Sequence, residues 1–283
     1  MKRLGLMTWI AGALVAFFIF MAICAPWIAF EGGPIIPHGP DVKAIGTQFI
    51  SNLQPPSTEH FLGSDYVGRD IAARLIHGIR NSLFFSFAVV FICMLIGCTI
   101  GGIMGFFGGW MDLFLSRFME IVGNFPIFLL QLTLLAFFDQ SYGILLFVMC
   151  LAGWIPYCRF TRAEFLRLRN QEFVQAAVGL GASRRRVFFR HLLPNSLTPL
   201  LIYFPFDLSS TIIVLGALSF LGFGEPINVA SLGELMRQAK NHFQEAWWLA
   251  VFPGLTLFLF TLSLALFGSA LRDWLDPRNA SNR

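Results

Sequence analysis

Six long runs of apolar residues follow one another along this sequence, and each is close to the roughly 20 residues that an α-helix needs to cross a bilayer. The runs cover residues 8–30, 82–107, 113–138, 142–160, 196–223 and 247–271. Apolar residues make up 56% of the chain and charged residues only 13%, which is more hydrophobic than a water-soluble core requires. The sequence therefore predicts an all-α integral membrane protein with six transmembrane helices.

The first apolar run follows Lys2 and Arg3, as the apolar part of a cleavable signal peptide would. That part of a signal peptide is only about 7–15 residues long, so we expect an uncleaved first helix after a short N-terminal segment, residues 1–7. All five cysteines fall inside predicted helices, where they behave as small apolar residues. Neither a disulfide framework nor a zinc site is expected from their spacing.

The lysines and arginines are distributed unequally between the two sides of this six-helix arrangement. Of the 20, 14 lie at the two ends of the chain, at the start of the third helix, and in or just before the loop 161–195. Because cytoplasmic loops are enriched in these residues, we expect that loop and both termini, including residues 272–283, to be cytoplasmic. The net charge of +4 then reflects topology, and with only three lysines the chain lacks the basic clusters of a nucleic-acid-binding protein.

Two segments are expected on the opposite side of the membrane, residues 31–79 and residues 224–246. The first is rich in proline, glycine and polar residues, and it is predicted to be a surface loop. Within the second, the pattern of residues 232–244 predicts a short amphipathic helix that lies along the membrane surface.

Four glycines recur at every fourth position of the second apolar run: Gly97, Gly101, Gly105 and Gly109. Small residues at this spacing let a partner helix approach closely, so the pattern predicts a tightly packed helix pair. Packing within this chain and packing against another subunit are both compatible with it.

Signatures of catalysis are scarce. None of the three lysines lies in a phosphate-binding P-loop, and the chain has neither a Gly-x-Ser-x-Gly nor a His-Glu-x-x-His motif. His60, Asp65, Asp70 and His77 could bind a metal in the first outward segment, but their spacing fits no standard zinc pattern and favours a solvated loop. A membrane enzyme that uses these four residues is kept as an alternative.

A basic segment, residues 175–195, separates two of the apolar runs, and we call it the elbow segment. Its alanine pair, a glycine four residues later and a Leu-Pro before the next run predict two short helices that meet at a turn. Gln175-Ala176-Ala177, Gly181 and Leu193-Pro194 resemble the cytoplasmic coupling loop of ABC importer permeases. The pattern of that family is Glu-Ala-Ala, three residues, Gly, and Leu-Pro after a fixed gap.

Further blocks extend the resemblance to the peptide and nickel permease group over nearly the whole chain. They are residues 60–65, 68–70, 108–112, 181–183, 190–195, 218–224 and 271–278. Residues 204–206, 231–235 and 238–240 look most like the Yej-type oligopeptide permeases, the second of the two permeases in such a system. Departures from the pattern are Gln175, which removes the charge of the usual glutamate, Leu232 in place of tryptophan, and Ser269 in place of an acidic residue.

The resemblance implies the type I ABC importer permease fold over residues 80–283, with a coupling helix seated in a groove of a separate ATPase subunit. The residues it implies for coupling are Gln175, Ala176, Ala177, Gly181, Ala182, Ser183, Arg184, Arg185, Arg190 and Pro194. The arginines would pair with acidic ATPase residues or contact anionic headgroups, an interaction worth about 1 kcal/mol per cation near a membrane.

The implied partners are a second homologous permease, which forms a heterodimer with this chain, two ATP-binding-cassette ATPase subunits, an extracytoplasmic substrate-binding protein and membrane lipid. ATP and Mg²⁺ would be bound by the ATPase subunits, so no cofactor, metal or catalytic residue is expected in this chain. The implied function is uptake of oligopeptides or dipeptides across the cell inner membrane. Nickel or another small solute is the alternative cargo within the family.

Polar side chains at membrane depth are the candidates for the substrate pathway: Asn124, Gln131, Asp207 and Ser210. A charge at that depth costs a few kcal/mol, so Asp207 is expected to face a wet cavity or a polar partner. A pathway-lining role and a structural hydrogen bond between helices both remain open for it. A secondary transporter is a third class of function, but we see no inverted repeat in the sequence.

Overall fold

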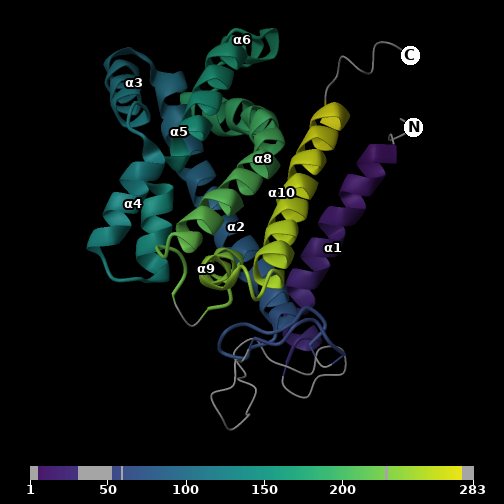
Figure 1. The fold of residues 1–283 in the computed structure, drawn as a ribbon. Coiled ribbons are helices and arrows are strands. Elements are labelled where there is room, and N and C mark those ends of the chain that lie inside the picture. Colours follow the sequence, from purple (N-terminus) through teal and green to yellow (C-terminus); the bar gives the residue numbers. More distant parts are fainter. Residues whose placement is uncertain (1–5, 31–52, 59, 227–228, 276–283) are drawn as a thin grey trace. The chain divides into compact units, whose positions relative to one another are not determined.

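The computed structural model describes residues 6–30, 53–58, 60–226 and 229–275, and within these ranges it contains helices and no strand (Figure 1). The elements in chain order are α1 (Leu6–Ile28), α2 (Ile71–Phe107), α3 (Gly109–Gly123), α4 (Ile127–Phe137), α5 (Tyr142–Arg169), α6 (Glu172–Gly179), α7 (Arg184–Arg186), the π-helical stretch η1 (Val187–Leu192), α8 (Leu193–Phe220), α9 (Leu232–His242) and α10 (Trp248–Leu275). The predicted all-α fold class is confirmed.

Five helical stretches of the described chain are long and apolar enough to cross a membrane, and the bent pair α3 and α4 would make a sixth span. The unbroken helix expected over residues 113–138 is wrong, because α3 and α4 meet at a bend of 77°. Pro126 explains the break: its ring lacks an N–H group and disfavours a helical conformation in the preceding residue.

Helix α2 begins at Ile71, so the expected surface loop 31–79 ends earlier than predicted. Asp70 starts the helix, since its Oδ1 accepts a hydrogen bond from the backbone N–H of Ala73 at 2.9 Å. A polar residue in the part of the expected loop that is helical, Arg74, is accommodated inside the protein. Arg74 is completely buried, and its Nε lies 3.9 Å from a carboxylate oxygen of Asp65.

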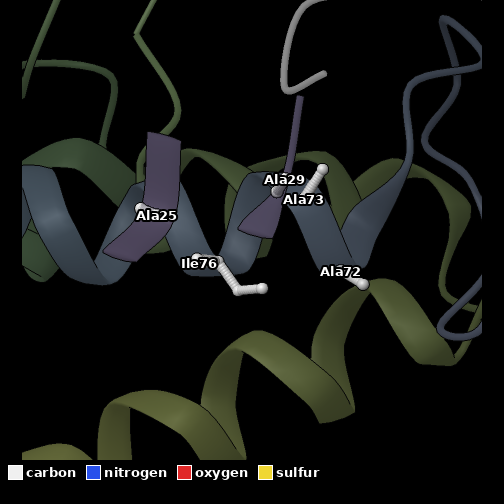
Figure 2. Packing of buried hydrophobic residues seen from close by; sticks show 5 residues of the cluster. All are labelled: Ala25, Ala29, Ala72, Ala73 and Ile76. Carbon is white, nitrogen blue, oxygen red and sulfur yellow. The ribbon is translucent and has the colours of Figure 1, made fainter. Parts of the chain in front are cut away.

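The chain divides into two compact units, which are described separately. The first contains the described parts of Met1–Phe87, Leu135–Leu145 and Leu208–Phe267. In it, alanines let the end of α1 and the start of α2 approach closely, and Figure 2 shows this cluster of Ala25, Ala29, Ala72, Ala73 and Ile76. Helices α1 and α10 run side by side (Figure 1), with the ring of Phe18 4.9 Å from that of Phe260.

Helix α9 is amphipathic as expected, but protein and not a membrane surface covers its apolar side. Leu232 and Leu235 are buried within the first unit, and a Cβ added at Gly78 of α2 would lie 3.2 Å from a methyl group of Leu232. Gly233 faces the backbone of α8, where an added Cβ would lie 2.6 Å from Cβ of Ser219. The apolar side of α9 is therefore buried in protein, and a location of this helix along the membrane surface stays a prediction.

The second unit contains Ala88–Leu134, Leu146–Asp207 and the described residues after Gly268. In it, the glycine stripe of α2 packs directly on α5. A Cβ at Gly97 would lie 2.5 Å from Cβ of Tyr157, and one at Gly105 would lie 2.6 Å from Cβ of Phe165. Gly109 does not belong to this stripe, because it follows the end of α2 at φ +64° and has open space around it. Three of the four glycines thus serve packing within the chain.

Candidate functional site

The elbow segment folds as predicted from its glycine, with α6 ending in a tight turn. The N–H of Gly181 donates to the carbonyl of Val178 at 2.9 Å, and the N–H of Ala182 donates to the carbonyl of Ala177 at 3.0 Å. This pair of hydrogen bonds is the Schellman arrangement, which needs a left-handed residue after the helix. Gly181 has φ +79°, a conformation that glycine adopts without steric cost.

A hydrophobic cluster fixes α6 to the neighbouring helices of the second unit. Val174 of α6 is 2% exposed, and it packs with Phe165 and Leu168 near the end of α5 and with Val187 and Leu192 of η1. Phe106, Phe188, Ala182 and Leu193 are partly buried against this cluster. Because close-packed cores transmit displacement, a force on α6 would act on α5 and on the start of α8 together.

Apolar side chains are exposed on α6 and at its C-cap residue Leu180, although no candidate membrane span includes this helix. Leu180 is 89% exposed, Val178 56% and Phe173 45%, and Gln175 and Ala176 are also exposed. Exposed apolar side chains on a helix of only eight residues are a feature that protein-binding surfaces share.

The second half of the elbow segment continues without interruption into α8. The side chain of Ser183 caps α7 by accepting a hydrogen bond from the N–H of Arg186 at 3.4 Å, and the chain then widens into the π-helical stretch η1. Pro194 lies exposed directly after η1, inside this continuous helix. Short π-helical stretches are frequent at functional sites.

The arginines of the elbow segment differ from three other arginines of the second unit, Arg117, Arg162 and Arg167. Arg184, Arg185 and Arg190 are exposed, and no carboxylate of the described residues forms an ion pair with them. By contrast, Arg162 and Arg167 each bind a carboxylate. The unpaired cations face an anionic partner outside the chain or remain solvated.

Sequence reasoning missed an ion pair that ties α3 to α5. Arg162 binds Asp112 with two parallel hydrogen bonds, one from Nε to Oδ1 and one from Nη2 to Oδ2 at 2.7 Å. Two such bonds fix the orientation of both side chains. The residues are 50 positions apart, so no local pattern could have revealed the pair.

The predicted pathway residues lie in different environments. Asp207 accepts a hydrogen bond from the hydroxyl of Tyr157 at 3.0 Å, which supplies the polar partner expected at that depth. Gln131 is buried, while Asn124 lies exposed at the bend after α3. Among the described residues no hydrogen bond joins Asn124, Gln131 and Asp207, and Ser210 is exposed on α8. The pathway therefore stays a prediction for these residues.

Three of the four metal candidates of the first outward segment, His60, Asp65 and Asp70, are buried, which corrects the expectation of a solvated loop. Nδ1 of His60 lies 2.8 Å from Oδ2 of Asp70, and both side chains are almost fully buried. The carboxylate of Asp65 accepts one hydrogen bond from Val67 and two from Arg69. His77 contacts a backbone carbonyl after α1 instead. In the described part of the chain, no three histidine, cysteine or acidic side chains converge as a metal site would require.

Glu225 is an acidic residue between α8 and α9 that the sequence analysis did not predict to be a functional residue. Glu225 is 7% exposed, and neither of its carboxylate oxygens has a well-aligned hydrogen-bond partner among the described residues. Burial raises the pKa of Glu225 to about 7, against a smaller opposing effect of the nearby Ser231 side chain. A carboxyl group in this position changes its charge near neutral pH.

The fold and the elbow segment together define a class of membrane transport component. A protein-family model for the binding-protein-dependent transport system inner membrane component matches residues 97–281. The chain belongs to this family, and it is a multi-pass inner-membrane protein. The family resemblance that the elbow segment and the other motifs suggested is thereby confirmed.

Individual relatives are permeases of transport systems by name. The chain is 43% identical to the peptidoglycan transport system permease protein YejE of Agrobacterium fabrum over 77% of its own length and 57% of the relative. It is 39% identical to the inner membrane ABC transporter permease protein YejE of Escherichia coli, over 80% of its own length and 66% of the relative. It is 32% identical to the dipeptide transport system permease protein DppC of Alkalihalophilus pseudofirmus, over 95% of its own length and 84% of the relative.

The matched region thus spans less than two thirds of each of the two YejE proteins. Against DppC it spans most of both chains. The Yej-type likeness expected from the sequence is confirmed by these matches.

Proposed function

We propose that this chain is the permease subunit of an ATP-driven ABC importer for peptides. It would form the pathway with a second, homologous permease, and two ATP-binding-cassette ATPase subunits would supply the energy. An extracytoplasmic binding protein would deliver the substrate to the outward segments. This subunit would contribute no catalytic residue, since ATP and Mg²⁺ would be bound by the ATPases.

The observation that carries the proposal is the exposure of three apolar residues, Phe173, Val178 and Leu180, on a rigidly anchored helix and its C-cap. These residues are apolar where a solvated helix would be polar, and Leu180 has almost its whole side chain available for burial. Close backbone approach by a partner is possible at Ala176 and Ala177 because their side chains are small. Closure of the ATPases would then move α6 and, through Val174, the ends of α5 and α8.

The remaining coupling residues have supporting roles in this proposal. Gly181, Ala182 and Ser183 shape the turn, and Pro194 lies where α8 begins. Arg184, Arg185 and Arg190 present cations toward an anionic partner. Gln175 is exposed, and its amide donates to the carbonyl of Asn170 at 3.5 Å, so it offers hydrogen bonds where the family pattern has a charge.

We infer the orientation from the asymmetry of lysines and arginines. Most of them, including the whole arginine cluster of the elbow segment, lie on one side of the predicted arrangement. The positive-inside rule then places the elbow segment and both termini in the cytoplasm. This is the side on which ATP is available to the partner subunits.

The peptide cargo is inferred from the relatives, whose names include peptidoglycan, dipeptide and oligopeptide transport systems. Asn124, Gln131, Asp207 and Ser210 are the proposed pathway residues. The hydrogen bond from Tyr157 would hold the Asp207 carboxylate in one orientation, where it could bind the amino terminus of a peptide. Nickel or another small solute is the competing cargo.

The test is ATP-dependent uptake into proteoliposomes that contain the chain with its second permease, both ATPases and the binding protein. Uptake of labelled short peptides with no uptake of nickel supports the proposal, and uptake of nickel alone contradicts the cargo. Leu180→Asp places a charge at the exposed C-cap of α6, and we expect uptake to fall at least about ten-fold, since burial of a leucine is worth about 1.5–3 kcal/mol. Leu180→Met, which stays apolar, should retain uptake. Equal activity of both variants would contradict docking through α6.

A further inference from the structure

Three adjoining hollows form a groove in the second unit, along α2 and the elbow segment. The first, of about 340 Å³, is lined by apolar residues from Met94 on α2 to Leu197 on α8. The second, of about 320 Å³, shares Ile103, Phe188 and Phe189 with the first. The third, of about 660 Å³, continues from the second past Phe106, Phe107 and Arg184.

The groove follows α2 for about the depth of one leaflet. Met94 and Phe107 are 13 positions apart on this helix, which corresponds to about 20 Å at the α-helical rise of about 1.5 Å per residue. One leaflet contributes about 15 Å of the bilayer's hydrocarbon core. Both α2 and α8 are candidate membrane spans, so the apolar part of the groove faces hydrocarbon or another helix.

The chemistry of the groove changes from one end to the other. Near Met94 it is lined by aliphatic side chains, a thiol and Thr99, whose hydroxyl already donates to a backbone carbonyl. Toward the end of α2 it is lined by the rings of Phe106, Phe107, Phe188 and Phe189 together with Arg184 and Arg185. No acidic residue lines any of the three hollows.

Arg184 and Arg185 reach this groove as uncompensated cations. They are exposed, and within the described ranges no carboxylate is paired with either of them. Arg169 adds a third guanidinium at the margin of the largest hollow. An occupant that matches this surface has a long apolar part and an anionic group at one end.

We propose that the groove is a binding site for an anionic glycerophospholipid of the cytoplasmic leaflet. One acyl chain would lie along α2 between Met94 and Phe107, and the phosphate would contact Arg184 and Arg185. The choice of leaflet rests on the proposed orientation of the elbow segment, whereas binding itself does not. A transmembrane helix of a partner would also suit the apolar part, but it would not bring an anion to the two arginines.

Such a lipid would contact α2, η1 and the start of α8 at once. These elements surround the hydrophobic cluster that fixes α6, so the lipid would stiffen the connection between α6 and the membrane helices. The proposal therefore predicts that transport depends on the anionic lipid content of the membrane.

The test measures the lipid that the purified transporter complex retains after reconstitution in vesicles. The vesicles contain phosphatidylethanolamine and phosphatidylglycerol at a 3:1 ratio, chosen as roughly that of a bacterial inner membrane. Native mass spectrometry of the complex should show phosphatidylglycerol enriched several-fold over its share in the vesicles. Arg184→Gln and Arg185→Gln should each reduce this enrichment by about five-fold, the equivalent of about 1 kcal/mol per cation.

Two matched variants separate this site from general surface charge. Arg186→Gln removes a neighbouring exposed cation that does not line the groove, and it should leave the enrichment unchanged. Thr99→Trp fills the apolar end without changing any charge, and it should reduce retention of both lipids. The proposal is overturned if retained lipid has the bulk composition, or if Arg186→Gln acts like Arg184→Gln. It is also overturned if a photoreactive residue at Phe189 cross-links to a protein partner and not to lipid.

Discussion

The contact between α2 and α5 gives the sharpest prediction for a single substitution, Gly97→Ala. The added Cβ would lie 2.5 Å from Cβ of Tyr157, 2.6 Å from the carbonyl oxygen of Trp154 and 2.8 Å from the backbone nitrogen of Cys158. Favourable contacts between carbon atoms need about 3.5–4.0 Å, so the two helices must separate by about 1 Å. Two of the three atoms belong to the backbone, and a rotamer change therefore cannot relieve the overlap.

The expected cost follows from two opposing effects. Overpacking of this kind costs up to about 3 kcal/mol, while replacing glycine by alanine within a helix gains up to about 1 kcal/mol. We expect a net loss of about 2 kcal/mol in the free energy of unfolding, measured by denaturant titration in mixed micelles. Transport should fall as well, because Tyr157 would be displaced from its hydrogen bond with Asp207.

Gly12→Ala is the matched control. Gly12 is also a glycine inside an apolar helix, α1, but it has open space where the Cβ would be added. The control should be neutral or slightly stabilising. A Gly97→Ala variant as stable as the control would refute the argument that the glycine stripe packs against α5.

Further substitutions test other features. Glu225→Gln should raise the free energy of unfolding most at alkaline pH. The wild type loses stability as pH rises from about 4.5 through about 7, because the raised pKa of Glu225 favours the protonated carboxyl in the folded state. At pH 8 the difference between variant and wild type should approach about 3 kcal/mol in thermal or denaturant unfolding. Gly181→Ala should cost about 1–2 kcal/mol at the left-handed turn and lower uptake at unchanged expression. Asp112→Asn should cost about 1 kcal/mol in unfolding experiments, and combining it with Arg162→Gln should recover part of that loss. The first expectation is contradicted if the stability of the wild type does not change with pH, and the second if Gly181→Ala leaves stability and uptake unchanged. The third is contradicted if the losses in stability from Asp112→Asn and Arg162→Gln are strictly additive.

The sequence predicted the helices well because apolar runs dominate it. The predicted helix bounds were wrong where polar residues are buried with partners: Arg74 fell within the predicted loop 31–79, yet it lies inside the first unit near Asp65. The run 113–138 looked continuous by hydropathy alone, although Pro126 breaks the hydrogen-bond pattern of the helix.

The elbow segment was the most predictable part of the candidate site, since its turn needs glycine at Gly181 and its motif is local. Contacts between distant residues were not predictable. The Arg162–Asp112 pair and the Tyr157–Asp207 hydrogen bond each join residues 50 positions apart. The burial of Glu225 likewise depends on the packing of α9 and not on any neighbouring sequence.

The central claim, that α6 docks on an ATPase subunit in the cytoplasm, can be tested by photocross-linking in the assembled transporter. A photoreactive phenylalanine analogue would replace Leu180, the C-cap residue of α6, in one variant and Phe243, which is 62% exposed after α9, in the other. The proposed function predicts an adduct with the ATPase subunit from position 180 and none from position 243. Absence of an ATPase adduct at position 180, or equal adducts at both positions, would contradict it.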